Sequence, residues 1–307
     1  MNTFMKTVTP PANVVEEVHQ FFKTDFSDED IFSNSTLKSD LPGTTDWLLE
    51  CKNLVDQHRA LLIKMPKKEN FNEHIKTHHS TALVFGQIFG RPLIQNEQGQ
   101  KLIAVYDRDR HGSMDTGARY HQTREGGTLH TDNVNLPELW NYLFLSCISP
   151  AFIGGESILV DGLKIHKILK TDFPEVLETL ENNYIWEMRG VADKLYEAPI
   201  ITYKDDKSPQ FRHLRPYMES AHIKAEKPMT IDQLFAIDVL DALTNSTKNQ
   251  ERFTLEAGNI CVTIDDQVLH GRTCFSDAKD AISVEKFTGE NGQVLKRTME
   301  RLWIQKQ

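Results

Sequence analysis

The sequence predicts a mainly β fold with flanking helices. From residue 101 onward, short runs of β-prone residues are separated by turn residues such as Gly126-Gly127 and Gly154-Gly155. Only a few helical patterns interrupt these runs, which favours a barrel or double-sheet jelly roll. The first hundred residues instead show apolar side chains at helical spacing. We therefore expect a single domain over residues 1–307, with a mostly helical part at 1–100 packed on a jelly-roll core with helical insertions at 101–307.

In the first part, helices are predicted over residues 14–22, 45–55 and 71–89. A Thr-Asp pair at the start of the second is a capping signal, and Gly90 ends the third. Residues 60–64 form a short apolar run and are predicted as a strand.

In the second part, further strands alternate with two helical interludes. Trp140, Tyr142 and Phe144 follow one another at a spacing of two, which is typical of sheet core. The predicted helices cover residues 164–180 and 231–243. The predicted strands cover residues 102–106, 141–148, 157–161, 184–189, 200–203, 253–255, 260–264 and 302–305.

Composition excludes several classes of partner. The chain has 35 Lys and Arg against 44 Asp and Glu, a net charge of −9, which argues against a general binder of nucleic acid or anionic lipid. No apolar run reaches the roughly 18 residues of a membrane span, and the start lacks the features of a secretory signal. Four scattered cysteines indicate no disulfide framework. We expect a cytoplasmic protein that acts on a small molecule; the oligomeric state is left open.

The segment His130-Thr131-Asp132 is the first candidate for chemistry. In a strand, side chains two residues apart project to the same face, so this histidine and this aspartate would offer two adjacent metal ligands. Taken alone, a His-x-Asp triplet is more often a solvated hydrogen-bonded pair.

Two further features strengthen the metal interpretation. The β-run at 260–264 leads through an acidic turn to His270-Gly271-Arg272. Two imidazoles and one carboxylate form the facial triad that leaves open positions on Fe(II). The last predicted strand extends back over residues 297–304, so that Arg297 and Arg301, four apart, lie on one face, and a guanidinium suits a carboxylate. The alternative for this pair is two surface arginines beside a terminal strand.

The order of these motifs resembles a known family. His-x-Asp is followed by Gly-Gly-Glu-Ser at 154–157, Asp-Asp-x-x-Leu-His-Gly-Arg at 265–272 and a late Arg-x-x-x-Arg. This order is similar to that of the Fe(II)/2-oxoglutarate-dependent dioxygenases related to taurine dioxygenase. The His-Gly-Arg ending resembles the clavaminate synthase and γ-butyrobetaine hydroxylase branch. In outline the resemblance runs from about residue 60 to the C-terminus.

The resemblance implies a double-stranded β-helix core and the cofactors Fe(II), 2-oxoglutarate and O₂. By position, His130, Asp132 and His270 match the iron ligands. Arg297 matches the arginine that pairs with the distal carboxylate of 2-oxoglutarate, and Ser157 lies where the family has a Thr or Ser near the keto acid. Residues 276–296 resemble an insertion that lengthens the gap before Arg297, so Arg301 or Arg272 stays open as an alternative.

The resemblance also implies an enzyme that converts 2-oxoglutarate to succinate while it oxidises a C–H bond of a small polar metabolite, such as an amino acid or a related amine or carboxylate. Hydroxylation, desaturation and cyclisation stay open. Arg301 matches a position where some members hold a substrate anion. Two alternatives are a cupin-like metalloenzyme that uses no keto acid and a non-catalytic jelly-roll binding module.

Other substrate candidates come from two polar segments. Residues 106–128 supply Arg119, Tyr120 and Arg124, although a solvated loop explains them about equally well. Arg212 lies in an aromatic and basic cluster at 211–217, which an edge strand also explains. His111 and His121 are competing metal ligands; they rank lower because neither lies two residues from a carboxylate on a plausible strand.

Overall fold

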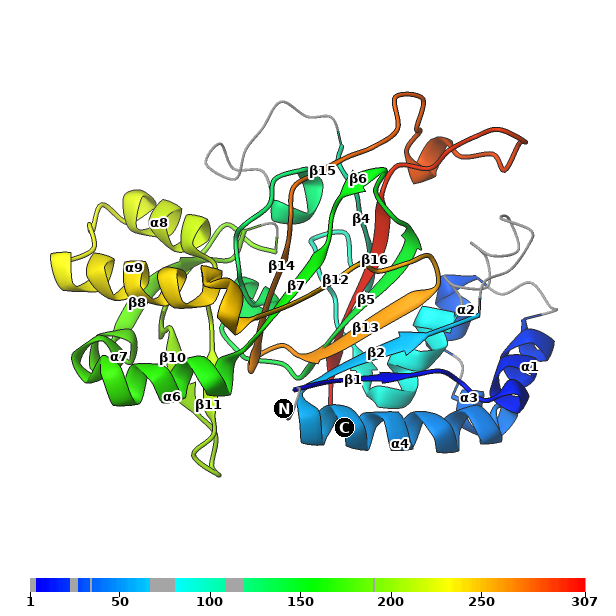
Figure 1. Cartoon of the computed structure of the whole chain (residues 1–307), viewed down its shortest axis with the longest axis horizontal. Coiled ribbons are helices and arrows are strands. Elements are labelled where there is room, and N and C mark those ends of the chain that lie inside the picture. Colours follow the sequence, from blue (N-terminus) through cyan, green and yellow to red (C-terminus); the bar gives the residue numbers. More distant parts are fainter. Residues whose placement is uncertain are drawn as a thin grey trace.

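A computed structural model describes residues 4–22, 27–33, 35–66, 81–108, 119–189 and 191–306. Its centre is a seven-stranded sheet in which β1, β2, β13, β5, β16 and β3 follow one another and β4 pairs with β16 (Figure 1). The pairing of β1 with β2 is parallel, whereas β13 pairs antiparallel with both β2 and β5, and β16 pairs antiparallel with β5. These strands are β1 (Met5–Val8), β2 (Ala60–Lys64), β3 (Arg91–Pro92), β4 (Leu102–Val105), β5 (Tyr142–Ser149), β13 (Asn259–Ile264) and β16 (Thr298–Gln305).

A second sheet, in the order β12-β7-β14, packs against the first. Leu159 and Val268 from this sheet share a buried cluster with Cys147, Cys261 and Met299 from the large sheet. Two facing sheets, antiparallel except for the β1–β2 pair, make the jelly-roll core that the sequence predicts. The strands are β7 (Ser157–Asp161), β12 (Gln250–Phe253) and β14 (Val268–Arg272). Three smaller pairs are β6 (Ile153–Gly154) with β15 (Phe275–Ser276), β8 (Asn183–Glu187) with β9 (Leu195–Pro199), and β10 (Ile201–Tyr203) with β11 (Pro209–Phe211).

Helices form two groups on either side of this core (Figure 1). The first group covers the outer face of the large sheet through one apolar cluster. It comprises α1 (Ala12–Phe21), α2 (Asp28–Ser33), α3 (Leu37–Asp40), α4 (Pro42–His58) and a helix through residues 81–89. The second group builds a separate cluster around β8. It comprises α6 (Gly162–Asp172), α7 (Pro174–Leu180), α8 (Arg215–Lys224) and α9 (Ile231–Asn245).

The mainly β fold class is confirmed, with local differences from the prediction. The helix predicted over 164–180 is two helices, because Pro174 begins α7 and cannot continue α6. The strand predicted at 253–255 ends at Phe253. The helix predicted over 71–89 is observed at 81–89, and its first residues lie outside the described ranges. The single-domain assignment stays a prediction. Within the described ranges, no helix is long and apolar enough to cross a membrane.

Strand β16 has two chemically different faces. Leu302 and Ile304 point to the first helical group, whereas Met299 lies in the cluster between the sheets. The helix at 81–89 approaches this strand closely at Gly90, where an added Cβ would lie 2.2 Å from the backbone oxygen of Gln305. This contact requires glycine, and it presses the helix onto the apolar face of β16.

Candidate metal centre

The backbone brings the two histidines together. His130 and His270 exchange backbone hydrogen bonds of 2.9 and 2.8 Å as an isolated antiparallel bridge beside β14. Their ring centroids lie 4.3 Å apart. The prediction that His130 and Asp132 share a strand face is correct for the extended backbone of His130 and wrong for Asp132. The extended backbone lasts through Thr131, and Asp132 begins a 3-10 turn that ends at Asn135.

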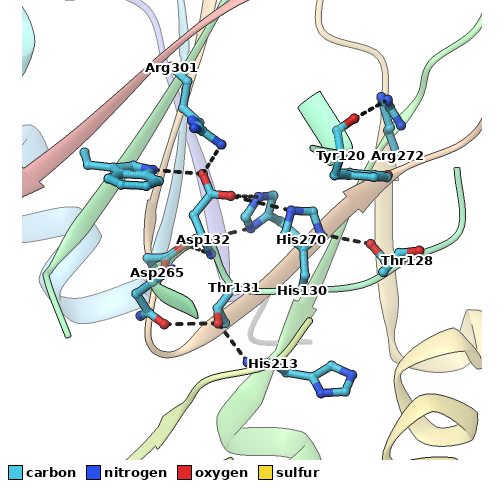
Figure 2. A network of polar contacts seen from close by, with 12 residues as sticks. Tyr120, Thr128, His130, Thr131, Asp132, His213, Asp265, His270, Arg272 and Arg301 are labelled. Atoms are coloured by element: carbon cyan, nitrogen blue, oxygen red, sulfur yellow. Dashed lines mark hydrogen bonds and ion pairs between the residues drawn. The ribbon is translucent and has the colours of Figure 1, made fainter. Parts of the chain in front are cut away.

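The three side chains converge (Figure 2). One ligand atom from each of His130, Asp132 and His270 lies within 4.8 Å of the others, and all three residues are buried. Asp132 Oδ1 is 3.6 Å from His130 Nε2 and 3.9 Å from His270 Nε2. His130 Nδ1 is 3.0 Å from the carbonyl oxygen of Thr128. Since a proton on Nδ1 satisfies that carbonyl, Nε2 presents its lone pair to the centre. This donor set suits a divalent transition metal.

The charge states fit metal binding. Although burial alone would raise it, the pKa of the Asp132 carboxyl is held well below its usual range by Arg301 and by the two imidazoles. Burial, together with neighbouring His130, lowers the pKa of His270 to about 3, which keeps this imidazole neutral. Burial and the charge of Asp132 raise the pKa of Asp265 well above its usual value. An ionised carboxylate beside a neutral imidazole is the state that a metal requires.

Asp132 is held by strand β16. Its Oδ2 accepts a hydrogen bond of 2.9 Å from Trp303 Nε1 and lies 3.0 Å from Arg301 Nη1. The other oxygen, Oδ1, is the one that faces the imidazoles. Two donors on one oxygen therefore fix which oxygen is directed to the metal position.

Arg297 lines the same cavity as the triad. Its side chain is buried, and within the described part of the chain its Nε and Nη1 have no hydrogen-bond partner. Burial, with the nearby charge of Arg272, lowers the pKa of Arg297 to about 10. A buried cation without a carboxylate partner is costly, so this site fits an anion.

The two alternative arginines are occupied by the protein. Arg272 donates to the carbonyl oxygens of Thr123 at 2.5 Å, Tyr120 at 3.4 Å and Glu125. Arg301 is paired with Asp132 and donates to Gln95 Oε1 at 2.8 Å, although its Nη2 has no partner among the residues described. Of the three candidates for a carboxylate of 2-oxoglutarate, Arg297 is the best suited by its contacts.

The remaining sequence candidates divide into two groups. Ser157 and Tyr120 line the cavity, and the buried hydroxyl of Tyr120 has no partner in the described residues. Arg119 lines an adjoining outer pocket instead. Arg124 has a side chain 59% exposed and pairs with Asp107. Arg212 donates to the backbone oxygen of Pro137 at 2.6 Å. Neither Arg124 nor Arg212 lines the cavity or the outer pocket, and His111 lies outside the described residues.

Two residues that contact the triad, Trp303 and Asp265, had no role in the sequence prediction, whereas His121 was predicted as a competing metal ligand. His121 lines both the cavity and the outer pocket but is not among the clustered ligands. Trp303 and Asp265 contact Asp132. A signal existed for Asp265, because it lies in the acidic turn before His270. Within the predicted insertion, Asp277 accepts the backbone N–H of Arg297 at 2.7 Å.

Comparison with known proteins identifies the family of the chain. Residues 24–288 match the model of the taurine catabolism dioxygenase TauD, TfdA family. FR-33289 synthase of Streptomyces rubellomurinus is 22% identical over 72% of the chain, and the taurine hydroxylase-like protein SAT17 of Stachybotrys chartarum is 25% identical over 49%. These matches span 62% and 38% of the two relatives.

Solved structures show the same fold. An asparagine oxygenase in complex with Fe(II), 3-hydroxyasparagine and succinate superposes with a TM-score of 0.69 at 13% identity, over 97% of this chain and 93% of that one. The non-haem iron oxygenase OrfP in complex with Fe and α-ketoglutaric acid superposes with a TM-score of 0.68 at 15% identity, over 98% and 94%.

Proposed function

Because this chain belongs to the taurine catabolism dioxygenase TauD, TfdA family, we propose that it is an Fe(II)- and 2-oxoglutarate-dependent oxygenase with His130, Asp132 and His270 as its iron ligands. The observation that carries the proposal is the buried cluster of these three side chains, with ligand atoms within 4.8 Å of one another. Iron with 2-oxoglutarate and O₂ supplies the oxidation of a C–H bond, coupled to the formation of succinate and CO₂.

In this proposal, some side chains around the cluster orient the metal ligands and others bind the co-substrate. Arg301 and Trp303 orient Asp132, and the imidazole of His130 is oriented by the carbonyl of Thr128. Arg297 binds the distal carboxylate of 2-oxoglutarate, because its buried Nε and Nη1 have no other described partner. Ser157 lines the cavity from the start of β7 and donates a hydrogen bond to the co-substrate.

The substrate in this proposal is a small polar metabolite, such as an amino acid or a related amine or carboxylate. The outer pocket carries charges of both signs, with Arg108 and Arg119 opposed by Glu97 and Glu285. His121 lines both this pocket and the metal cavity, so the two lie next to each other. A zwitterion fits such a mixed lining. The asparagine oxygenase and OrfP structures contain hydroxylated amino acids, which supports the same class.

The test is turnover of 2-oxoglutarate. Purified protein with Fe(II), ascorbate and 2-oxoglutarate in air should form succinate slowly by itself and faster with one member of a panel of amino acids, amines and carboxylates. Mass spectrometry of that mixture distinguishes a hydroxylated, desaturated or cyclised product. Asp132→Ala is the control and should form no succinate. Iron binding without any consumption of 2-oxoglutarate would instead indicate the cupin-like alternative.

A further inference from the structure

Asp265 is a buried carboxylate that the proposed reaction does not use. It directly follows β13 and is 0% exposed. Its Oδ1 accepts the backbone N–H of Asp132 at 3.0 Å, and its Oδ2 accepts that of Asn133 at 2.9 Å. Asp265 therefore caps the turn that carries Asp132, from a position 133 residues away in the chain.

The same carboxylate faces a second ligand. Asp265 Oδ1 lies 4.0 Å from Nδ1 of His270. That nitrogen is buried and has no hydrogen-bond partner in the described part of the molecule, whereas Nε2 of the same ring faces Asp132. An imidazole that binds a metal through Nε2 carries its proton on Nδ1, and such a proton normally has a carboxylate or carbonyl acceptor.

Charge balance favours this arrangement. Asp132 and Asp265 are two buried carboxylates, and Arg301 contacts only the first of them in the described residues. A divalent cation next to Asp132 adds the positive charge that a second buried carboxylate needs.

We infer that Asp265 is a positioning residue of the metal site: it fixes the turn that presents Asp132 and accepts the Nδ1 proton of metal-bound His270. The inference rests on the proposed function only in taking these two residues as ligands. It adds a residue that controls metal affinity without contacting the metal.

The chain offers a matched control one residue further on. Asp266 is also buried, at 1% exposed, but it accepts from Lys204 Nζ at 3.1 Å and from Gln210 Nε2 at 2.5 Å. Asp265→Asn and Asp266→Asn thus each replace one buried carboxyl group by an amide, at adjacent positions, and only the first of these groups lies beside the triad.

The experiment measures anaerobic Fe(II) affinity by competition with a chromogenic chelator. We expect Asp265→Asn to weaken binding by about 10- to 100-fold. Asp266→Asn should change it by less than about threefold. Asp265→Glu, which restores a carboxyl group at a shifted position, should recover part of the loss. A thermal unfolding curve of each variant before iron is added reports whether the fold is retained.

A second readout separates positioning from general support of the fold. In the Co(II)-loaded protein, the paramagnetically shifted N–H proton resonances of the two histidines can be followed by NMR. Asp265→Asn should shift or broaden one of them, and Asp266→Asn should leave both in place.

Two results would overturn the inference. The first is wild-type affinity in Asp265→Asn, and the second is an equal loss in both asparagine variants together with unchanged N–H resonances. If the wild-type protein binds no Fe(II), the proposed function itself fails, and that outcome is distinct from either of these.

Discussion

The two faces of the large sheet are equally buried and chemically opposite. On the helical face, Phe144, Leu302 and Ile304 pack into a large cluster of hydrophobic side chains. On the facing side of the same strands, Arg301 and Trp303 direct polar atoms to Asp132. Alternation with a period of two lets one strand, β16, serve both faces.

The difference indicates that stability and chemistry are divided between the faces. The apolar face gains from burial of hydrocarbon surface. The site face keeps Arg297 buried without a described carboxylate partner, which lowers stability in return for an anion site. Substitutions on the two faces should therefore affect different measurements.

The largest expected effect on stability lies on the helical face. Phe144 is 0% exposed and meets the ring of Phe89 edge-on at a centroid distance of 4.9 Å. Phe144→Ala should lower the free energy of unfolding by about 3–5 kcal/mol, because it removes a ring and leaves a cavity. Urea denaturation measures this change. The Fe(II) affinity of the folded variant should stay near the wild-type value, and a tenfold loss would mean that the two faces are not independent.

On the site face, a smaller change in the free energy of unfolding is expected, and it should be an increase. Arg297→Met removes a buried charge and should raise the free energy of unfolding without ligands by about 1 kcal/mol. It should also raise the apparent KM for 2-oxoglutarate at least about tenfold, since one charge-assisted pair to a carboxylate is lost. Thermal unfolding and succinate formation check the two halves.

Arg301→Met is the matched control for this substitution. Because it breaks the ion pair with Asp132, Arg301→Met should lower the free energy of unfolding. Its effect on the KM for 2-oxoglutarate should be much smaller than that of Arg297→Met. The reverse order of KM values would assign the co-substrate carboxylate to Arg301.

The last prediction concerns the pH dependence of stability. Burial and the charges of Arg301, Arg119 and Arg108 hold the pKa of His121 well below its usual value. The unfolded chain takes up this proton near pH 6.5, whereas the folded protein does not. Stability is therefore complete above pH 6.5 and falls below it, by up to about 1.4 kcal/mol per pH unit for this group. Urea denaturation between pH 8 and 5 should show a shallower decline in His121→Gln; equal slopes would exclude this residue as a cause.

The motif around His270 could be predicted locally, because it follows a β-run that the sequence itself indicates. The runs at 141–148 and 260–264 are apolar and β-branched, and they correspond to β5 and β13. His270 comes shortly after the second of these runs and lies in β14, a strand of the smaller sheet. In these segments local preference and tertiary packing agree.

Contacts between distant segments could not be predicted in this way. Asp132 lies in a turn because Asp265 accepts its backbone N–H, and no local pattern around residue 132 indicates that partner. Tyr120 and Arg124 belong to one polar loop, yet Arg272 ties the backbone of that loop so that Tyr120 lines the cavity and Arg124 does not. Loop side chains have no periodicity from which such a division could be predicted.

The central claim is that His130, Asp132 and His270 hold one iron ion beside 2-oxoglutarate. Anaerobic addition of 2-oxoglutarate to the Fe(II)-loaded protein tests it most directly, by visible absorption. The account predicts a weak charge-transfer band in the wild-type protein and none in folded Asp132→Ala. A wild-type protein that binds Fe(II) but shows no band, or a band that persists in Asp132→Ala, would contradict the claim.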